Sequence, residues 1–130
     1  MATLTIQDRT ATGRPVDSFT IEDLPDRITV RDLIRTRVRD EVARYNLRPL
    51  EMFRGLVAPT DAEQSVDGYR LRKPRTLDWE KQADIAIDAF GRNGFFVLVN
   101  GRQATDLDQE ISVGDTADVA FVKLVQLVGG

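Results

Sequence analysis

The chain has 130 residues, of which 42% are hydrophobic and 30% charged, and a formal net charge of -3; this balance is typical of one globular domain, expected over residues 1–130, and disfavours nucleic-acid binding. It contains neither Cys nor His, which excludes disulfides, thiol nucleophiles and imidazole bases, so we expect no enzyme activity, no metal site and no bound cofactor. The N-terminus lacks a signal-peptide pattern and no apolar stretch is long enough to span a membrane, so we expect a cytoplasmic protein without membrane contact.

The first residues predict a β-hairpin. Leu4 and Ile6 lie at alternate positions, as do Phe19 and Ile21, and the stretch at residues 11–15 between the two pairs is rich in turn-forming residues. Alternation of this kind places the apolar side chains of a strand on one face. The sequence therefore begins with two predicted strands.

A helix is predicted next, from about Val30 to Tyr45. Thr29 and Asp32 resemble a capping box in which Asp replaces the usual Glu. The apolar residues that follow recur at steps of three or four: Val30, Leu33, Ile34, Val38, Val42 and Tyr45. The other face is charged and is interpreted as solvated: Arg31, Arg35, Arg39, Asp40 and Glu41.

The middle of the chain has a looser pattern. Three prolines interrupt the stretch from Leu47 to Arg75, and a second helix is predicted from about Leu77 to Arg92. Its apolar face comprises Trp79, Ala83, Ala86, Ile87 and Phe90. We interpret residues 47–92 as a segment inserted between the main helix and the third strand.

The last third predicts two further strands. Phe95 to Val99 is β-branched and aromatic, and Asn100-Gly101 after it is a strong hairpin-turn signal. After a second turn at Gly114-Asp115, a long closing strand is predicted from Val119 to Leu127. A flexible tail of residues 128–130 is expected to follow, because it ends in two glycines.

This order of elements, with a closing strand that runs into Gly129-Gly130, resembles the β-grasp family of ubiquitin and the bacterial sulfur carriers. Ubiquitin ends in Leu-Val-Leu-Arg-Leu-Arg-Gly-Gly, and residues 123–130 read Lys-Leu-Val-Gln-Leu-Val-Gly-Gly. The sulfur carriers of molybdopterin and thiamine synthesis show a similar Leu-Val-Asn-Gly hairpin, which is residues 98–101 here, and a Gly-Asp turn. The resemblance implies an α+β fold, a ubiquitin-like β-grasp carrying an inserted helical segment.

The resemblance also implies a function for the tail. A ubiquitin-like protein modifier is activated by adenylation of its C-terminal carboxylate, here that of Gly130, and is then joined to a target protein. The implied partners are an ATP-dependent adenylating activating enzyme, a conjugating enzyme, a deconjugating isopeptidase and the target. Two alternatives remain open: a sulfur carrier with a C-terminal thiocarboxylate, and a β-grasp interaction module that is not conjugated.

The predicted site has two parts. Gly130 and Gly129 are the conjugation residues, because glycines without Cβ can thread a narrow enzyme channel. The predicted partner-binding residues are Val128, Leu127, Gln126, Leu124 and Val122. If Val119 and Phe121 point inward, Val122 and Leu124 point outward on the closing strand.

Two weaker candidates complete the set. Asp106, Asp108 and Glu110 recur at every second residue and are interpreted as a solvated loop rather than as a cluster of acids on one strand face. Trp79 and Phe90 are interpreted as core residues rather than as the lining of a ligand groove.

Overall fold

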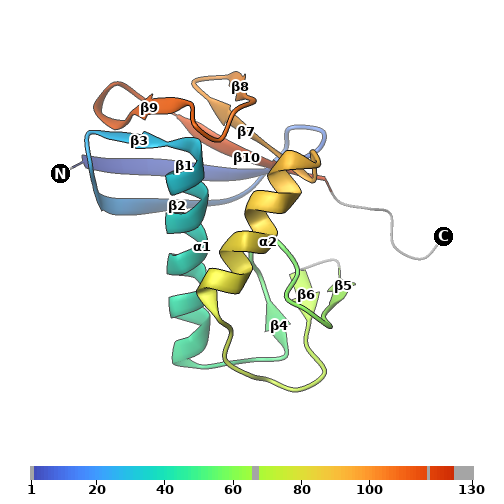
Figure 1. Cartoon of the computed structure of the whole chain (residues 1–130). Helices are drawn as coiled ribbons and strands as arrows, with labels where there is room; N and C mark the ends of the chain where they lie inside the picture. The colour runs from blue at the N-terminus through green and yellow to red at the C-terminus, as the bar shows by residue number, and fades with distance from the viewer. Residues whose placement is uncertain (1, 66–67, 117, 125–130) are drawn as a thin grey trace. The chain divides into compact units, whose positions relative to one another are not determined.

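The structure, a computed structural model, describes residues 2–65, 68–116 and 118–124. In these ranges it has a mixed sheet of five strands, two smaller sheets and two α-helices (Figure 1). The predicted α+β class is therefore confirmed. The chain divides into two compact units: unit 1 lies within Met1–Leu33 and Phe90–Val125, and unit 2 comprises Ile34–Ala89.

Unit 1 is built on the five-stranded sheet, with strand order β2-β1-β10-β7-β8. Its strands are β1 (Ala2–Thr10), β2 (Pro15–Leu24), β7 (Phe95–Val99), β8 (Arg102–Ala104) and β10 (Val119–Lys123). β10 occupies the middle of the sheet, parallel to β1 and antiparallel to β7 (Figure 1). The first and last strands of the described chain are therefore neighbours at the centre of the sheet.

The predicted strands are found, with changes at their ends. β7 has the predicted bounds, and the turn after it has φ of 50° at Asn100 and 81° at Gly101, the left-handed pair that a two-residue hairpin turn requires. The closing strand was predicted to reach Leu127, but β10 ends at Lys123, and residues 125–127 lie outside the described residues. β2 is longer than predicted, because its pairing with β1 continues on both sides of Phe19 and Ile21.

A second, two-stranded sheet in unit 1 was not predicted. It pairs β3 (Arg27–Thr29) with β9 (Glu110–Ser112), and a 3₁₀ turn, η1 (Val113–Asp115), follows. Ile28 and Ile111 are directly opposite each other and both are buried. Strands of three residues are too short to show a period in the sequence, so tertiary pairing defines them.

Unit 1 has its apolar residues on one face of the main sheet, as alternation requires. The buried members of that face include Leu4, Ile6, Ile21, Phe95, Val97, Val119 and Phe121. Three rings pack in series: the centroids of Phe90 and Phe95 are 6.0 Å apart, and those of Phe95 and Phe121 are 5.9 Å apart. The predicted inward phase of Val119 and Phe121 is thus confirmed.

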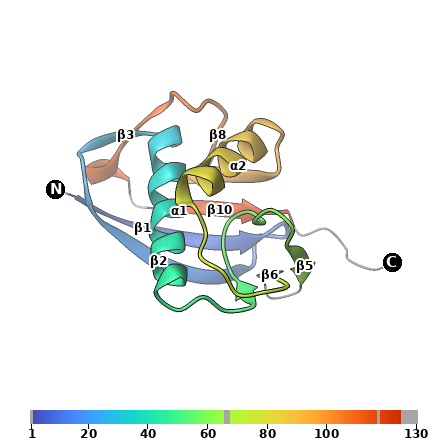
Figure 2. The same ribbon diagram turned by 60° about the horizontal axis from the view of Figure 1, so that its bottom comes forward.

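Unit 2 contains a three-stranded sheet with strand order β4-β6-β5, and Figure 2 shows β5 beside β6. Its strands are β4 (Met52–Phe53), β5 (Glu63–Ser65) and β6 (Gly68–Arg70). The helices are α1 (Val30–Leu47), which begins in unit 1, and α2 (Trp79–Gly91), which ends there. Both helices were predicted to within two residues at each end, whereas no strand was predicted between Leu47 and Arg75.

Glu41, on the predicted solvated face of α1, is paired with a buried arginine instead of being solvated. The Arg37 side chain is only 2% exposed, and its Nε lies 2.5 Å from Glu41 Oε1. Glu41 Oε2 also accepts a hydrogen bond from the Leu56 backbone N–H at 3.0 Å. Glu41 was predicted to be solvated, but it bridges a buried guanidinium and the loop after β4, because a buried cation needs a partner.

Candidate functional site

The predicted partner-binding residue Val122 lies near the end of the central strand β10. Because Phe121 is fully buried, alternation directs Val122 to the opposite face of the sheet. Val122 is half-buried there. Leu124 follows the strand and has 41% of its surface exposed. Both predicted residues thus have accessible apolar surface.

The neighbours of Val122 on this face are also apolar. On β7, Phe96 lies opposite Val122 and Leu98 lies opposite Ala120. We call these four residues the sheet patch: Phe96, Leu98, Ala120 and Val122. Ala120 is buried, and the three larger side chains are half-buried. The patch therefore spans the two antiparallel strands at the centre of the sheet.

A polar rim borders the sheet patch along β1, where Gln7 and Arg9 lie opposite Ala120 and Val122. Arg9 Nε donates a 2.6 Å hydrogen bond to Gln7 Oε1, and its Nη2 lies 3.5 Å from Asp118 Oδ2. The Arg9–Asp118 pair is partly exposed, so it contributes little to stability. An apolar centre with a charged rim is the arrangement typical of protein-binding surfaces.

The start of β10 is fixed by the hairpin turn after β7. The Asn100 N–H donates to the Asp118 carbonyl at 2.8 Å, and the Asp118 N–H donates to Asn100 Oδ1 at 3.1 Å. This two-point contact sets where β10 begins. The alternation of its side chains, and hence the direction of Val122, follows from that point.

The remaining predicted site residues lie outside the part of the chain that the structure describes. They are the conjugation residues Gly129 and Gly130 and the partner-binding residues Gln126, Leu127 and Val128. Their assignment remains a prediction, as does the tail at residues 128–130.

Phe96 and Leu98 were not among the predicted site residues. The segment Phe95 to Val99 is apolar at every position, which indicates a strand covered on both faces and hides its alternation. The structure separates the positions, since Phe95 and Val97 are buried while Phe96 and Leu98 are only half-buried. Alternate residues of a strand point to opposite faces, so counting in steps of two from an inward-facing Phe95 would have placed Phe96 and Leu98 on the outer face.

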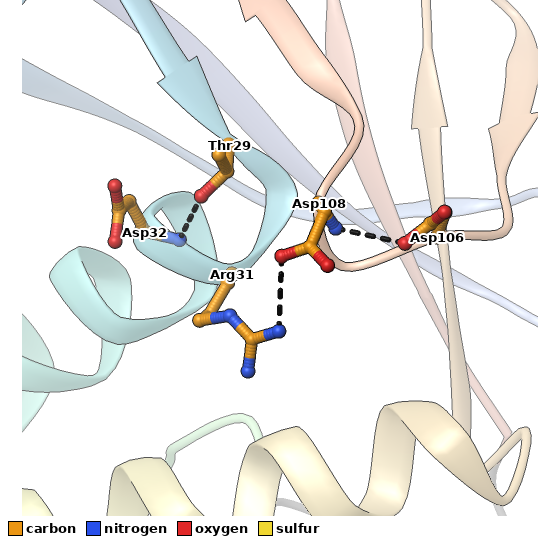
Figure 3. Close-up of polar contacts among 5 residues, drawn as sticks. All are labelled: Thr29, Arg31, Asp32, Asp106 and Asp108. Atoms are coloured by element: carbon orange, nitrogen blue, oxygen red, sulfur yellow. Dashed lines mark hydrogen bonds and ion pairs between the residues drawn. The ribbon is translucent and has the colours of Figure 1, made fainter.

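The carboxylates of Asp106 and Asp108 have structural roles (Figure 3). Asp106 Oδ1 accepts from the Asp108 N–H at 2.9 Å, and Asp108 Oδ1 lies 3.0 Å from Arg31 Nη2. The Leu107 carbonyl accepts from the Arg31 N–H, and Asp32 N–H donates to Thr29 Oγ1 at 3.1 Å. The loop thus satisfies donors in the first turn of α1.

The third acid of that series, Glu110, lies 3.8 Å from Arg27 across the β3–β9 pair, and both side chains are largely exposed. The interpretation as a solvated loop therefore agrees with the structure for Asp106 and Asp108, whereas Glu110 is exposed on strand β9, where pairing with β3 defines the strand. The two aromatic candidates differ in burial. Phe90 is buried in unit 1. Trp79 is half-buried in unit 2, and the Cζ atom of Arg35 lies 5.2 Å from its ring centroid.

Within residues 2–65, 68–116 and 118–124, no group of three or more acidic side chains is placed to hold a metal ion. In the same part of the chain, neither helix has the length and apolar character needed to cross a membrane. Comparison of the chain with protein-family models, with curated proteins and with solved structures gives no match in any of the three.

Proposed function

We propose that this protein is a ubiquitin-like protein modifier with a β-grasp fold, conjugated through the carboxylate of Gly130. The observation that carries the proposal is the course of β10. This central strand pairs with β1 in parallel, ends at Lys123 and is followed in the sequence by Leu-Val-Gln-Leu-Val-Gly-Gly. A strand fixed on both sides can present the residues after it to an enzyme from a rigid support.

The sheet patch supplies a docking surface in this proposal. An activating enzyme would contact Val122 and Leu124 with the neighbouring Phe96 and Leu98, and would receive the tail from the same strand. The chain contributes no catalytic group to the reaction. The enzyme would adenylate the Gly130 carboxylate with ATP. A thiol would then attack the carbonyl carbon and displace AMP, which forms a thioester. Finally, a lysine amine of the target would displace the thiol and form an amide bond.

The experiment is recovery of the N-terminally tagged chain under denaturing conditions from its own host cells, followed by trypsin digestion and mass spectrometry. Trypsin cleaves after Lys123, so a modified target lysine would carry residues 124–130 as a branch. A matched variant without Gly129 and Gly130 should yield no branched peptide. Intact mass of the recovered chain tests the requirement that Gly130 be its last residue.

Two other results would replace the proposal. An oxygen-to-sulfur exchange at the terminal carboxylate, without branched peptides, would identify a sulfur carrier. If full-length and shortened chains carry no modification, and both recover the same non-covalent partners in a parallel recovery under native conditions, the protein is an interaction module and the glycines have no role.

A further inference from the structure

The chain contains two Asn-Gly pairs, Asn93-Gly94 and Asn100-Gly101. Asparagine is a chemically labile residue, and a following glycine favours loss of its carboxamide because a nitrogen without a neighbouring Cβ is easily reached by the Asn side chain. All four residues are exposed. The backbone is also alike, since φ is 59° at Asn93 and 50° at Asn100. By residue type, exposure and backbone region, the two pairs should therefore react equally.

Hydrogen bonding separates the two pairs. Asn100 Oδ1 accepts from the Asp118 N–H at 3.1 Å, and the Asn100 N–H donates to the Asp118 carbonyl at 2.8 Å. Both the side chain and the backbone of Asn100 are thus held at the start of β10. Attack by the Gly101 nitrogen requires the Asn side chain to turn toward it, and a carboxamide held by Asp118 resists that movement.

Asn93 is held through its backbone, because its N–H donates to the Phe90 carbonyl at 3.1 Å after the last turn of α2. Among the residues that the structure describes, neither the carboxamide of Asn93 nor the N–H of Gly94 has a hydrogen-bond partner. The Asn93 side chain can therefore turn toward the Gly94 nitrogen without breaking a contact.

We propose that Asn93 is a site of spontaneous deamidation in the folded protein, whereas Asn100 is protected. The Gly94 nitrogen attacks Cγ of Asn93, a new C–N bond forms, and the carboxamide C–N bond breaks. Ammonia leaves with the proton of the attacking nitrogen. Water then opens the resulting succinimide at one of its two carbonyls. The products are Asp and isoAsp, and in isoAsp the chain continues through Cβ.

The modification changes the junction between α2 and β7. Phe90 before it and Phe95 after it are both buried, and their ring centroids are 6.0 Å apart. IsoAsp inserts one backbone atom between these rings, and both products place a negative charge near the C-terminus of a helix, where it is unfavourable. The deamidated chain is therefore less stable than the unmodified one. This inference is independent of the proposed conjugation and of the C-terminal glycines.

The test is incubation of the full chain in mildly alkaline buffer, followed by digestion with a lysine-specific protease in mildly acidic buffer. Lys81 and Lys123 are consecutive lysines, so one peptide, residues 82–123, contains both pairs, and fragment masses locate the exchange of nitrogen for oxygen. In the folded chain Asn93 should react about tenfold or more faster than Asn100, because a hydrogen bond of ordinary strength opposes the reaction at Asn100. In concentrated urea, which removes this contact, the two asparagines should react at similar rates.

Two glycine variants and one stability measurement complete the test. Gly94→Ala should slow the reaction at Asn93, because a methyl group hinders the attacking nitrogen. The control Gly91→Ala should leave the rate unchanged, since a Cβ there would meet no atom within 4 Å. The isoAsp form, separated by chromatography, should melt at a lower temperature than the unmodified chain.

Three results would overturn this inference. Asn100 reacts as fast as Asn93 in the folded chain, or the ratio of the two rates is the same with and without urea. Alternatively, Gly94→Ala and Gly91→Ala change the rate at Asn93 equally, which would mean that the succinimide does not form through Gly94. An isoAsp form that melts with the unmodified chain would contradict the expected effect on the junction of α2 and β7.

Discussion

Replacement of Phe121 by Ala tests the phase of β10, on which the whole sheet patch depends. Phe121 is fully buried and its ring packs 5.9 Å from that of Phe95. Removal of such a ring costs about 3 to 5 kcal/mol, through lost burial and the cavity that remains. The entropy of unfolding is about 2.1 cal/mol/K per residue, or about 0.27 kcal/mol/K for 130 residues. Each kcal/mol therefore lowers Tm by about 3.7 °C, and the variant should melt about 11 to 18 °C lower.

Calorimetry or circular dichroism measures this change, with Val16→Ala as the control. Val16 is 64% exposed on the edge strand β2, so its truncation should change stability by no more than about 0.5 kcal/mol, or about 2 °C. A Phe121→Ala variant that melts within that control range would refute the reasoning. Phe121 would then lie on the accessible face and Val122 in the core.

Three further changes test other parts of the structure. Val122→Ser with Leu124→Ser should leave Tm nearly unchanged while it weakens affinity for the activating enzyme by about 2 kcal/mol or more; a steep fall in Tm would mean that both residues are core. Glu41→Ala should cost about 3 to 5 kcal/mol in urea unfolding, because it removes the carboxylate that lies 2.5 Å from the buried Arg37 guanidinium, whereas the exposed Glu63→Ala should cost less than about 0.5 kcal/mol. Burial, and then the charge of Glu41, raise the pKa of Tyr69 above its ordinary value of 10.0. The folded state thus favours the neutral phenol of Tyr69. The resulting contribution to the free energy of unfolding is fully present below pH 10.0 and should be lost as the pH rises through the folded pKa. Tyr69→Phe should flatten this alkaline loss; an unchanged slope would contradict it.

The amino-acid sequence alone was enough to predict the elements governed by short-range chemistry. Thr29 and Asp32 marked the start of α1, and the Asp32 N–H does bond to Thr29 Oγ1. Asn100-Gly101 marked the hairpin after β7, and both residues adopt the positive φ that the turn needs. Helix caps and tight turns depend on a few neighbouring residues, so their signals survive in the sequence.

The sequence did not predict the environment of single side chains within those elements. Glu41 lay on the predicted solvated face of α1, but its carboxylate joins buried Arg37 to the backbone of Leu56. Helical periodicity locates a residue on a face and says nothing about which distant loop packs there. The strands of unit 2, each of two or three residues, likewise depend on pairing rather than on a local pattern.

By itself, then, the sequence determined the α+β class, the helices and the β7 hairpin. Only the tertiary structure decided that β10 lies between β1 and β7, and that Phe96 and Leu98 accompany Val122 on one face. These contacts join segments far apart in the chain. Their register is set by the packing of the whole sheet, because a shift of one residue would exchange the two faces of every strand.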